Sequence, residues 1–187
     1  MTTALLLIDM QNDFVLEDAS FAVKGAKSII QNTKKILATF RKHDLPIFHI
    51  VRAHKADGSD VEITRREKFK KTPYTVENTD GAEIIHELRP KEDEYIIIKK
   101  RMSGFINTDL EKRLRSSGVD KVVITGVQTP NCIRATAFDA IAYDYETYLV
   151  EDAVAANTQE IHDANILDMK NIGIKMIKTK DVEEMLK

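Results

Sequence analysis

The sequence predicts an α/β domain built as a three-layer αβα sandwich around a six-stranded, mostly parallel sheet. Short apolar runs alternate with longer amphipathic stretches from one end of the chain to the other. Most of these runs are apolar throughout, as expected of parallel strands that are covered on both faces. The chain has 187 residues, and no linker or internal repeat divides it. We therefore expect residues 1–187 to form a single domain.

Six runs have the length and composition of buried strands. They span residues 4–8, 46–51, 95–98, 121–125, 146–150 and 173–177.

Two helices are predicted by their spacing and by their ends. Apolar side chains recur every three or four residues in 26–43, which is the pattern of an amphipathic helix. Thr108 followed by Glu111 predicts a capping box at the start of another helix. Gly118 is a suitable stop for that helix.

Further helices are expected after the fourth and fifth strands. One should span about 130–143, and another 158–170 with Thr158 as its N-cap. A short closing helix is expected over 181–186.

One long interval interrupts the alternation. About forty residues separate the second strand from the third, and most are polar with weak periodicity. A short helix over 82–88 is the one element that the pattern predicts there. Connections of this length are uncommon in compact domains unless they are lids or binding loops, so we interpret residues around 52–90 as such a segment.

Composition excludes several classes of partner. Lys plus Arg number 28 and Asp plus Glu number 30, a balance that argues against nucleic acid and against an anionic membrane surface. The single cysteine cannot form an intramolecular disulfide. The longest apolar run, 4–8, is far below the ~18 residues of a spanning helix, and no signal-peptide pattern precedes it. We expect a cytoplasmic protein that acts on a small molecule.

Three reactive side chains follow the predicted strands. Asp9 comes directly after the first strand, Lys99 after the third, and Cys132 where a helix should follow the fourth. Each has an ordinary alternative: an N-cap, a solvated strand end, and a buried small hydrophobe. Ligands of open α/β sheets bind at this edge of the sheet. Together the three supply a proton-transfer carboxylate, a cation that favours the thiolate, and a nucleophile for acyl-transfer hydrolysis.

Other chemistries fit these positions less well. Residues 9–14 contain no glycine, which disfavours phosphate or dinucleotide binding, and supply one carboxylate where aspartyl phosphatases use Asp-x-Asp. Phe138 stands six residues after Cys132, where a cysteine phosphatase needs arginine. A redox protein would need a resolving cysteine. A sheet-based binding module without turnover remains the non-enzymatic alternative.

Three spaced motifs resemble those of one superfamily. Residues 6–14 read Leu-Leu-Ile-Asp-Met-Gln-Asn-Asp-Phe, and residues 99–105 read Lys-Lys-Arg-Met-Ser-Gly-Phe. Residues 126–133 read Gly-Val-Gln-Thr-Pro-Asn-Cys-Ile, followed by Thr136 and Ala137. In this order they resemble the isochorismatase-like cysteine hydrolases, which include nicotinamidases and N-carbamoylsarcosine amidases.

The resemblance implies an isochorismatase-like (Rossmann-like) hydrolase fold with a triad of Asp9, Lys99 and Cys132. The register of the lysine motif selects Lys99 over Lys100. The implied reaction is hydrolysis of a small amide or carbamoyl substrate through a thioester acyl-enzyme. Isochorismatase-type vinyl ether hydrolysis and nicotinamidase activity are the alternatives.

The resemblance also implies a cis peptide between Val127 and Gln128. The backbone N–H groups of Gln128 and Cys132 would then form an oxyanion hole. A homodimer or homotetramer is the implied assembly.

The metal site of nicotinamidases has no full counterpart here. That site uses Asp-x-His and a further histidine beyond the second strand, whereas this chain has Arg52-Ala53-His54. The carboxylates near His54 are Asp57, Asp60 and Glu62. We expect no transition metal and no cofactor, as in a metal-independent branch.

Four further residues are expected to contact substrate. Arg52 follows the second strand and would bind a substrate carboxylate, unless it forms an ion pair within the protein. Gln11, Phe14 and Phe105 are expected at the pocket wall from their places in the motifs, although both phenylalanines fit a core equally well.

Overall fold

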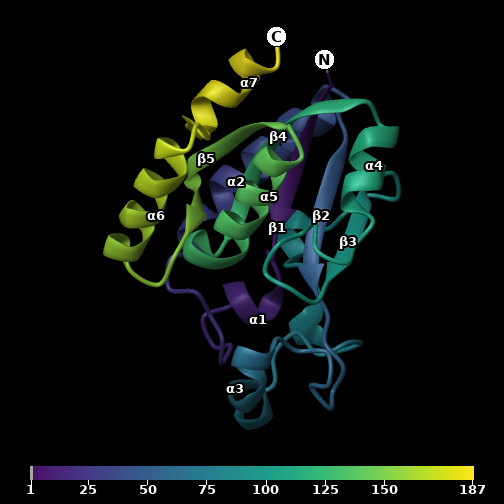
Figure 1. Cartoon of the computed structure of the whole chain (residues 1–187), viewed down its shortest axis with the longest axis vertical. Helices are drawn as coiled ribbons and strands as arrows, with labels where there is room; N and C mark the ends of the chain where they lie inside the picture. Colours follow the sequence, from purple (N-terminus) through teal and green to yellow (C-terminus); the bar gives the residue numbers. More distant parts are fainter. Residues whose placement is uncertain (1) are drawn as a thin grey trace.

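A six-stranded, all-parallel sheet forms the centre of the protein (Figure 1), and the predicted α/β fold is confirmed. The computed structural model describes residues 2–187. The strand order is β3-β2-β1-β4-β5-β6. The strands are β1 (Thr2–Ile8), β2 (Ile47–Arg52), β3 (Tyr95–Lys99), β4 (Val119–Val127), β5 (Glu146–Ala155) and β6 (Lys175–Ile177).

Helices cover both faces of the sheet, which explains why its strands are apolar throughout. Leu5 and Leu7 of β1 enter the core beneath α2 (Ala26–Lys42). Leu6 and Ile8 enter the opposite core, beneath the helices that follow β3, β4 and β5. Those helices are α4 (Leu110–Ser116), α5 (Arg134–Ala142) and α6 (Gln159–Asn171). Successive side chains of a strand point to opposite faces, so a sheet with two cores needs an unbroken apolar run.

The ends of the helices follow the prediction in one case and differ in another. The Thr158 hydroxyl accepts a hydrogen bond from the N–H of Ile161 and caps α6, as expected. The predicted capping box at Thr108 is wrong, because α4 begins at Leu110 and its N-cap is Asp109. The Thr108 hydroxyl instead accepts the N–H of Leu110 in the turn before the helix. The chain ends with α7 (Val182–Met185).

The long interval folds against the sheet without forming the one helix predicted at 82–88. It contains α3 (Arg66–Lys71) and 3-10 turns at Ile63–Arg65, Asp80–Ala82 and His86–Leu88. Its buried hydrophobic side chains, all in the core on the α2 side, are Val61, Phe69, Tyr74, Ile85 and Leu88. We call residues 52–90 the lid segment. Figure 1 shows α3 beyond the carboxyl ends of β1 and β2, beside the short helix α1 (Asn12–Val15).

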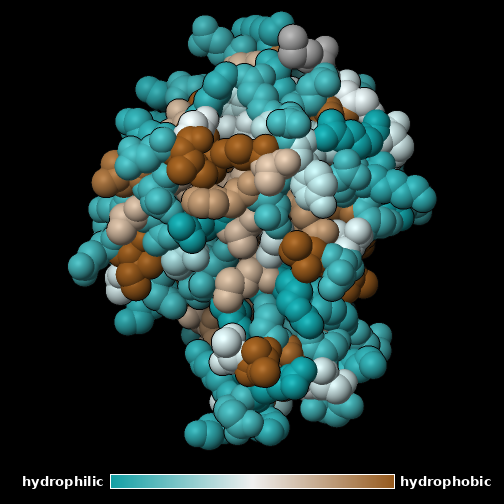
Figure 2. Space-filling model, in the orientation of Figure 1, coloured by the Kyte–Doolittle hydropathy of each residue, from teal (hydrophilic) through white to brown (hydrophobic). Residues whose placement is uncertain are grey.

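The outer surface is mixed. On the face in Figure 2, hydrophobic side chains form small separate groups among hydrophilic ones. No helix within residues 2–187 combines the length and apolar character needed to cross a bilayer.

A buried histidine on β2 makes the fold sensitive to acid. His49 is 2% exposed, and its Nε2 lies 2.7 Å from Oε2 of Glu94, which also pairs with Arg41 at 2.6 Å. Burial is the main reason that the pKa of His49 lies below its ordinary value. The unfolded chain therefore binds a proton at a higher pH than the folded one, and stability is lost as pH falls below about 6.5.

We expect His49→Gln to reduce this acid sensitivity. Between pH 7.5 and 5.5, the free energy of unfolding of the native protein should fall more than that of the variant, by on the order of 1 kcal/mol. Urea unfolding at both pH values measures the difference. His86→Gln is the matched control, because His86 is exposed. Equal losses in the native protein and His49→Gln would contradict the assignment.

Candidate active site

Four polar side chains meet at the carboxyl edge of the sheet. Asp9 follows β1, Arg52 ends β2 and Lys99 ends β3. Cys132 lies in a turn after β4, and β4 is the neighbour of β1. The four side chains come from adjacent strands, at the edge where open α/β sheets bind ligands.

The three residues of the predicted triad are in contact. The Lys99 ammonium donates to Oδ2 of Asp9 at 2.8 Å and to Sγ of Cys132 at 3.4 Å. Each of the three residues is at most 4% exposed. A cation held between a carboxylate and a thiol, with little water present, can support proton transfer and nucleophilic attack.

The backbone around these side chains is unusual at two points. Asp9 has φ +53°, a left-handed conformation that Asp and Asn adopt more readily than most residues. The peptide between Val127 and Gln128 is cis.

The turn that carries Cys132 differs from the predicted α-helix. Residues Thr129–Ile133 form a π-helical turn, and the α-helix α5 begins after it, at Arg134. Cys132 therefore lies in a turn of the type that is frequent at functional sites, ahead of the α-helix expected from residue 130. The Asn131 amide donates to Oε1 of Gln128 at 3.1 Å and ties the middle of the turn to the residue that precedes it.

Arg52 is completely buried and lies against two of the three candidate residues, Cys132 and Asp9. Its Nη2 donates to Sγ of Cys132 at 3.5 Å, and its Nε lies 3.8 Å from Oδ2 of Asp9. Glu62 of the lid segment binds the outer side of the guanidinium, at 2.9 and 3.1 Å. Burial alone would lower the pKa of Arg52, but the charges of Cys132, Asp9 and Glu62 raise it above its ordinary value. Of the two expectations for Arg52, the structure therefore shows the internal ion pair.

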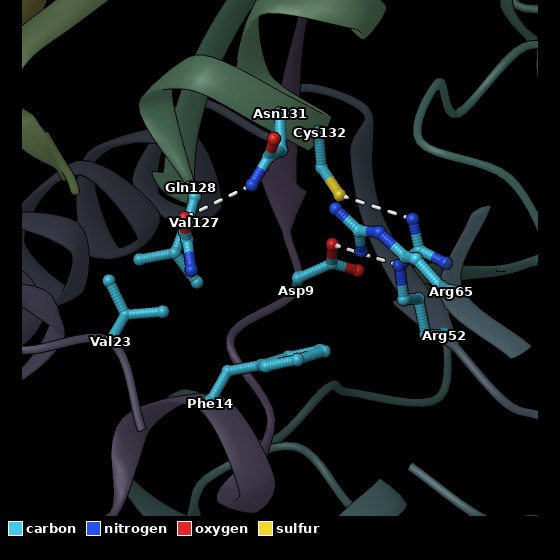
Figure 3. A pocket seen from close by; sticks show the side chains of 9 residues that line it. All are labelled: Asp9, Phe14, Val23, Arg52, Arg65, Val127, Gln128, Asn131 and Cys132. Atoms are coloured by element: carbon cyan, nitrogen blue, oxygen red, sulfur yellow. Dashed lines mark hydrogen bonds and ion pairs between the residues drawn. The ribbon is translucent and has the colours of Figure 1, made fainter. Parts of the chain in front are cut away.

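A small pocket of about 250 Å³ opens over these side chains (Figure 3). It is lined by Asp9, Phe14, Val23, Arg52, Arg65, Val127, Gln128, Asn131 and Cys132. Oδ1 of Asp9 and Nε of Arg52 are buried without a hydrogen-bond partner in residues 2–187. These two atoms are therefore free to bind polar groups of a ligand.

Two residues expected at the pocket wall lie elsewhere. The Gln11 side chain is buried and clamps the backbone: its amide donates to the carbonyls of Arg52 and Ala82, and its oxygen accepts the N–H of Arg52. Phe105 belongs to the core on the α4 and α5 side, where it stacks on Tyr143. Phe14 does line the pocket.

The groups around His54 are turned toward internal partners. His54 is buried, with Nδ1 3.3 Å from Asp60 and Nε2 3.4 Å from Nη1 of Arg52. Burial, and then the charge of Arg52, lower the pKa of His54 below its ordinary value. Asp57 accepts the N–H of Ser59 in its own turn. Among residues 2–187, no three His, Cys, Asp or Glu side chains are grouped so that they could hold a metal ion.

Glu62 and Arg65 were not predicted as site residues. They lie on the lid segment, whose path across the pocket depends on a few buried aromatic side chains rather than on a periodic pattern. The charged residues of this long polar loop were the one sequence feature that could have indicated them. The sequence does not say which of these side chains turn inward.

Three comparisons with known proteins agree on the family. The model of the family "Isochorismatase domain" matches residues 3–181. A protein of Arabidopsis thaliana described as a probable inactive nicotinamidase is 50% identical, over 92% of this chain and 90% of its own length.

Solved structures of the same family are also similar. An isochorismatase family protein from Desulfovibrio vulgaris is 41% identical with a TM-score of 0.95, covering 99% of this chain and 98% of its own. An N-carbamoylsarcosine amidase from Thermoplasma acidophilum is 30% identical with a TM-score of 0.81, covering 96% and 97%.

Proposed function

Because this chain belongs to the isochorismatase family, we propose that it is a cysteine hydrolase that cleaves a small amide or carbamoyl substrate through a thioester. The observation that carries the proposal is the contact of Lys99 with both Asp9 and Cys132 at the wall of a small pocket. The solved N-carbamoylsarcosine amidase, which shares the fold, supports an amide-type substrate.

The first half of the reaction acylates the enzyme. Asp9 takes the proton of the Cys132 thiol, and Lys99 holds the resulting thiolate beside it. The sulfur attacks the substrate carbonyl carbon, a C–S bond forms, and the carbonyl electron pair moves to oxygen. The N–H groups of Gln128 and Cys132 receive that oxyanion. Asp9 then gives its proton to the leaving nitrogen, the C–N bond breaks, and an amine or ammonia departs.

The second half of the reaction releases the acid. Asp9 is again a carboxylate and takes a proton from water, whose oxygen attacks the thioester carbon. The carbonyl re-forms as the C–S bond breaks, the acid departs, and the thiolate of Cys132 takes from Asp9 the proton that came from water. Oδ1 of Asp9, which has no partner in residues 2–187, is the oxygen available to bind both the leaving amine and this water.

The pocket restricts the substrate to a short chain with an anionic end. It is small, and Phe14, Val23 and Val127 form an apolar wall. Arg65 of the lid segment supplies a positive charge to the lining of the pocket. A short amide that carries a carboxylate matches these walls, since arginine binds carboxylates well.

A substrate panel with mass spectrometry tests the proposal. The panel contains monoamides of short dicarboxylic acids, N-carbamoyl amino acids, nicotinamide and isochorismate. We expect ammonia or amine release from the acidic amides or carbamoyl compounds, and an acyl adduct on Cys132 in samples quenched with acid. Cys132→Ser should bind the same compounds without forming that adduct.

Two results would contradict the proposal. Turnover of isochorismate without an adduct would indicate vinyl ether chemistry. Ligand-induced stabilisation with neither turnover nor adduct across the panel would indicate a binding module.

A further inference from the structure

More charged side chains surround Cys132 than the proposed triad requires. Two cations, Lys99 and Arg52, lie within 3.5 Å of the sulfur. Three acidic groups share these cations: Asp9, Glu62 and the thiol itself. The two cations balance two negative charges. In an electrically neutral cluster, two of the three acids are therefore ionised and the third keeps its proton.

The structure restricts where that proton resides. Burial alone would raise the pKa of Glu62, but its hydrogen bond to Arg52 and the charge of Arg52 bring it below its ordinary value. Glu62 is therefore ionised, and its charge offsets one of the two cations. His54 adds no charge near neutral pH, because its pKa is lowered. Other titratable or charged groups near this turn are Arg65, across the pocket, and His162 of α6, bonded to Thr129. Arg101, Arg134 and Asp139 line a separate pocket on the far side of the turn, together with Pro130 and Asn131.

We propose that Arg52 is a second cation for the Cys132 thiolate, and that Glu62 on the lid segment sets how strongly this cation acts. The inference rests on the proposed role of Cys132 as the nucleophile. A thiolate at Cys132 has both Lys99 and Arg52 beside its sulfur, and Glu62 lies on the outer side of Arg52.

Arg52 is held so that its charge cannot move away from the sulfur. The Gln11 side chain bonds both the N–H and the carbonyl of Arg52. Glu62 and His54 then fix the guanidinium, whose exposure is 0%. A buried cation at this distance acts on the thiolate far more strongly than an exposed one would.

Glu62 partly neutralises the same cation from the other side. It lies next to Val61, which is completely buried, so its position follows the packing of the lid segment. Glu62 is a positioning residue by this argument, because it acts on the sulfur through Arg52.

Titration of the Cys132 thiol tests the roles of Arg52 and Glu62 separately. The chain has only one cysteine, so the signal comes from this residue alone. The rate of alkylation by iodoacetamide is measured against pH, together with the ultraviolet absorbance of the thiolate. For Arg52→Gln we expect the midpoint to rise by about 1 pH unit or more. For Glu62→Gln we expect it to fall, because the amide still accepts a hydrogen bond while the opposing charge is gone.

Controls separate this electrostatic effect from a structural one. Glu67→Gln removes a carboxylate from the same lid segment, where Glu67 is exposed and pairs with Lys70, and should leave the midpoint unchanged. Arg52→Lys keeps the charge and should titrate closer to the native protein than Arg52→Gln does. Loss of packing alone would shift the titration midpoints of Arg52→Gln and Glu62→Gln in the same direction, whereas the proposal requires shifts in opposite directions.

The outcomes distinguish this inference from the proposed function. Midpoints that both rise, or that both stay within about 0.3 pH unit of the native value, would overturn it. If Arg52→Gln does not fold, the comparison of Glu62→Gln with Glu67→Gln still decides, since an unchanged or higher midpoint in Glu62→Gln overturns the proposal. Opposite shifts without turnover of any panel compound would support the inference and refute the hydrolase.

Discussion

Asp9→Asn should lower the kcat of amide hydrolysis by about 10³-fold while the fold is retained. The proposed reaction uses this carboxylate three times: to take the thiol proton, to protonate the leaving nitrogen and to activate water. An amide performs none of these transfers. Asn also adopts the left-handed backbone that Asp9 has at φ +53°, so the substitution leaves the end of β1 unstrained.

Alkylation provides the internal control for this variant. Without the carboxylate, the Lys99 ammonium has the Cys132 sulfur as its remaining anionic neighbour, at 3.4 Å. Iodoacetamide should therefore modify Asp9→Asn at least as fast as the native protein at neutral pH. Steady-state kinetics on the best panel substrate give kcat. A value within tenfold of the native enzyme would mean that another group transfers the protons.

The strands, and the meeting of Asp9, Lys99 and Cys132 at one edge of the sheet, could be predicted because their signals are local. A fully buried parallel strand requires a continuous apolar run, and the ligand site lies where such runs end. Asp9, Lys99 and Cys132 each stand at such an end, and the fold then brings them together.

The lid segment could not be predicted in the same way. Its helix α3 buries one side chain, Phe69, so it has no apolar stripe to recognise. The contact of Glu62 with Arg52 joins residues ten positions apart through an irregular path. For Phe105 the sequence left two alternatives open, a pocket wall and the core, and its side chain fills the core on the α4 and α5 side of the sheet.

The close approach of β1 and β4 beneath the site depends on one glycine. Gly126 pairs with Ile8 in the sheet and has φ +117°. A Cβ added there would lie 2.1 Å from the carbonyl oxygen of Ile8, which is backbone and cannot turn aside. The two strands could accommodate it only by moving apart, and they carry Asp9 and the turn with Cys132.

Gly126→Ala should therefore be among the most damaging single substitutions in this chain. We expect a loss of about 4 kcal/mol or more in the free energy of unfolding. That loss corresponds to a melting temperature lower by about 10 °C or more, or to failure to fold. Gly118→Ala is the matched control: φ is +62° there, but no atom lies within 4 Å of the added Cβ. Backbone conformation alone should cost Gly118→Ala about 1 kcal/mol, or a few degrees.

Thermal unfolding of the two variants separates conformation from contact. Similar losses in both would mean that positive φ, rather than the close approach of Ile8, makes Gly126 necessary. A soluble fraction of Gly126→Ala should also lose alkylation of Cys132 at neutral pH, because separation of β1 from β4 withdraws Asp9 and its partner Lys99 from the sulfur. Native alkylation in that fraction would show that the site tolerates the displacement, and that the glycine serves stability alone.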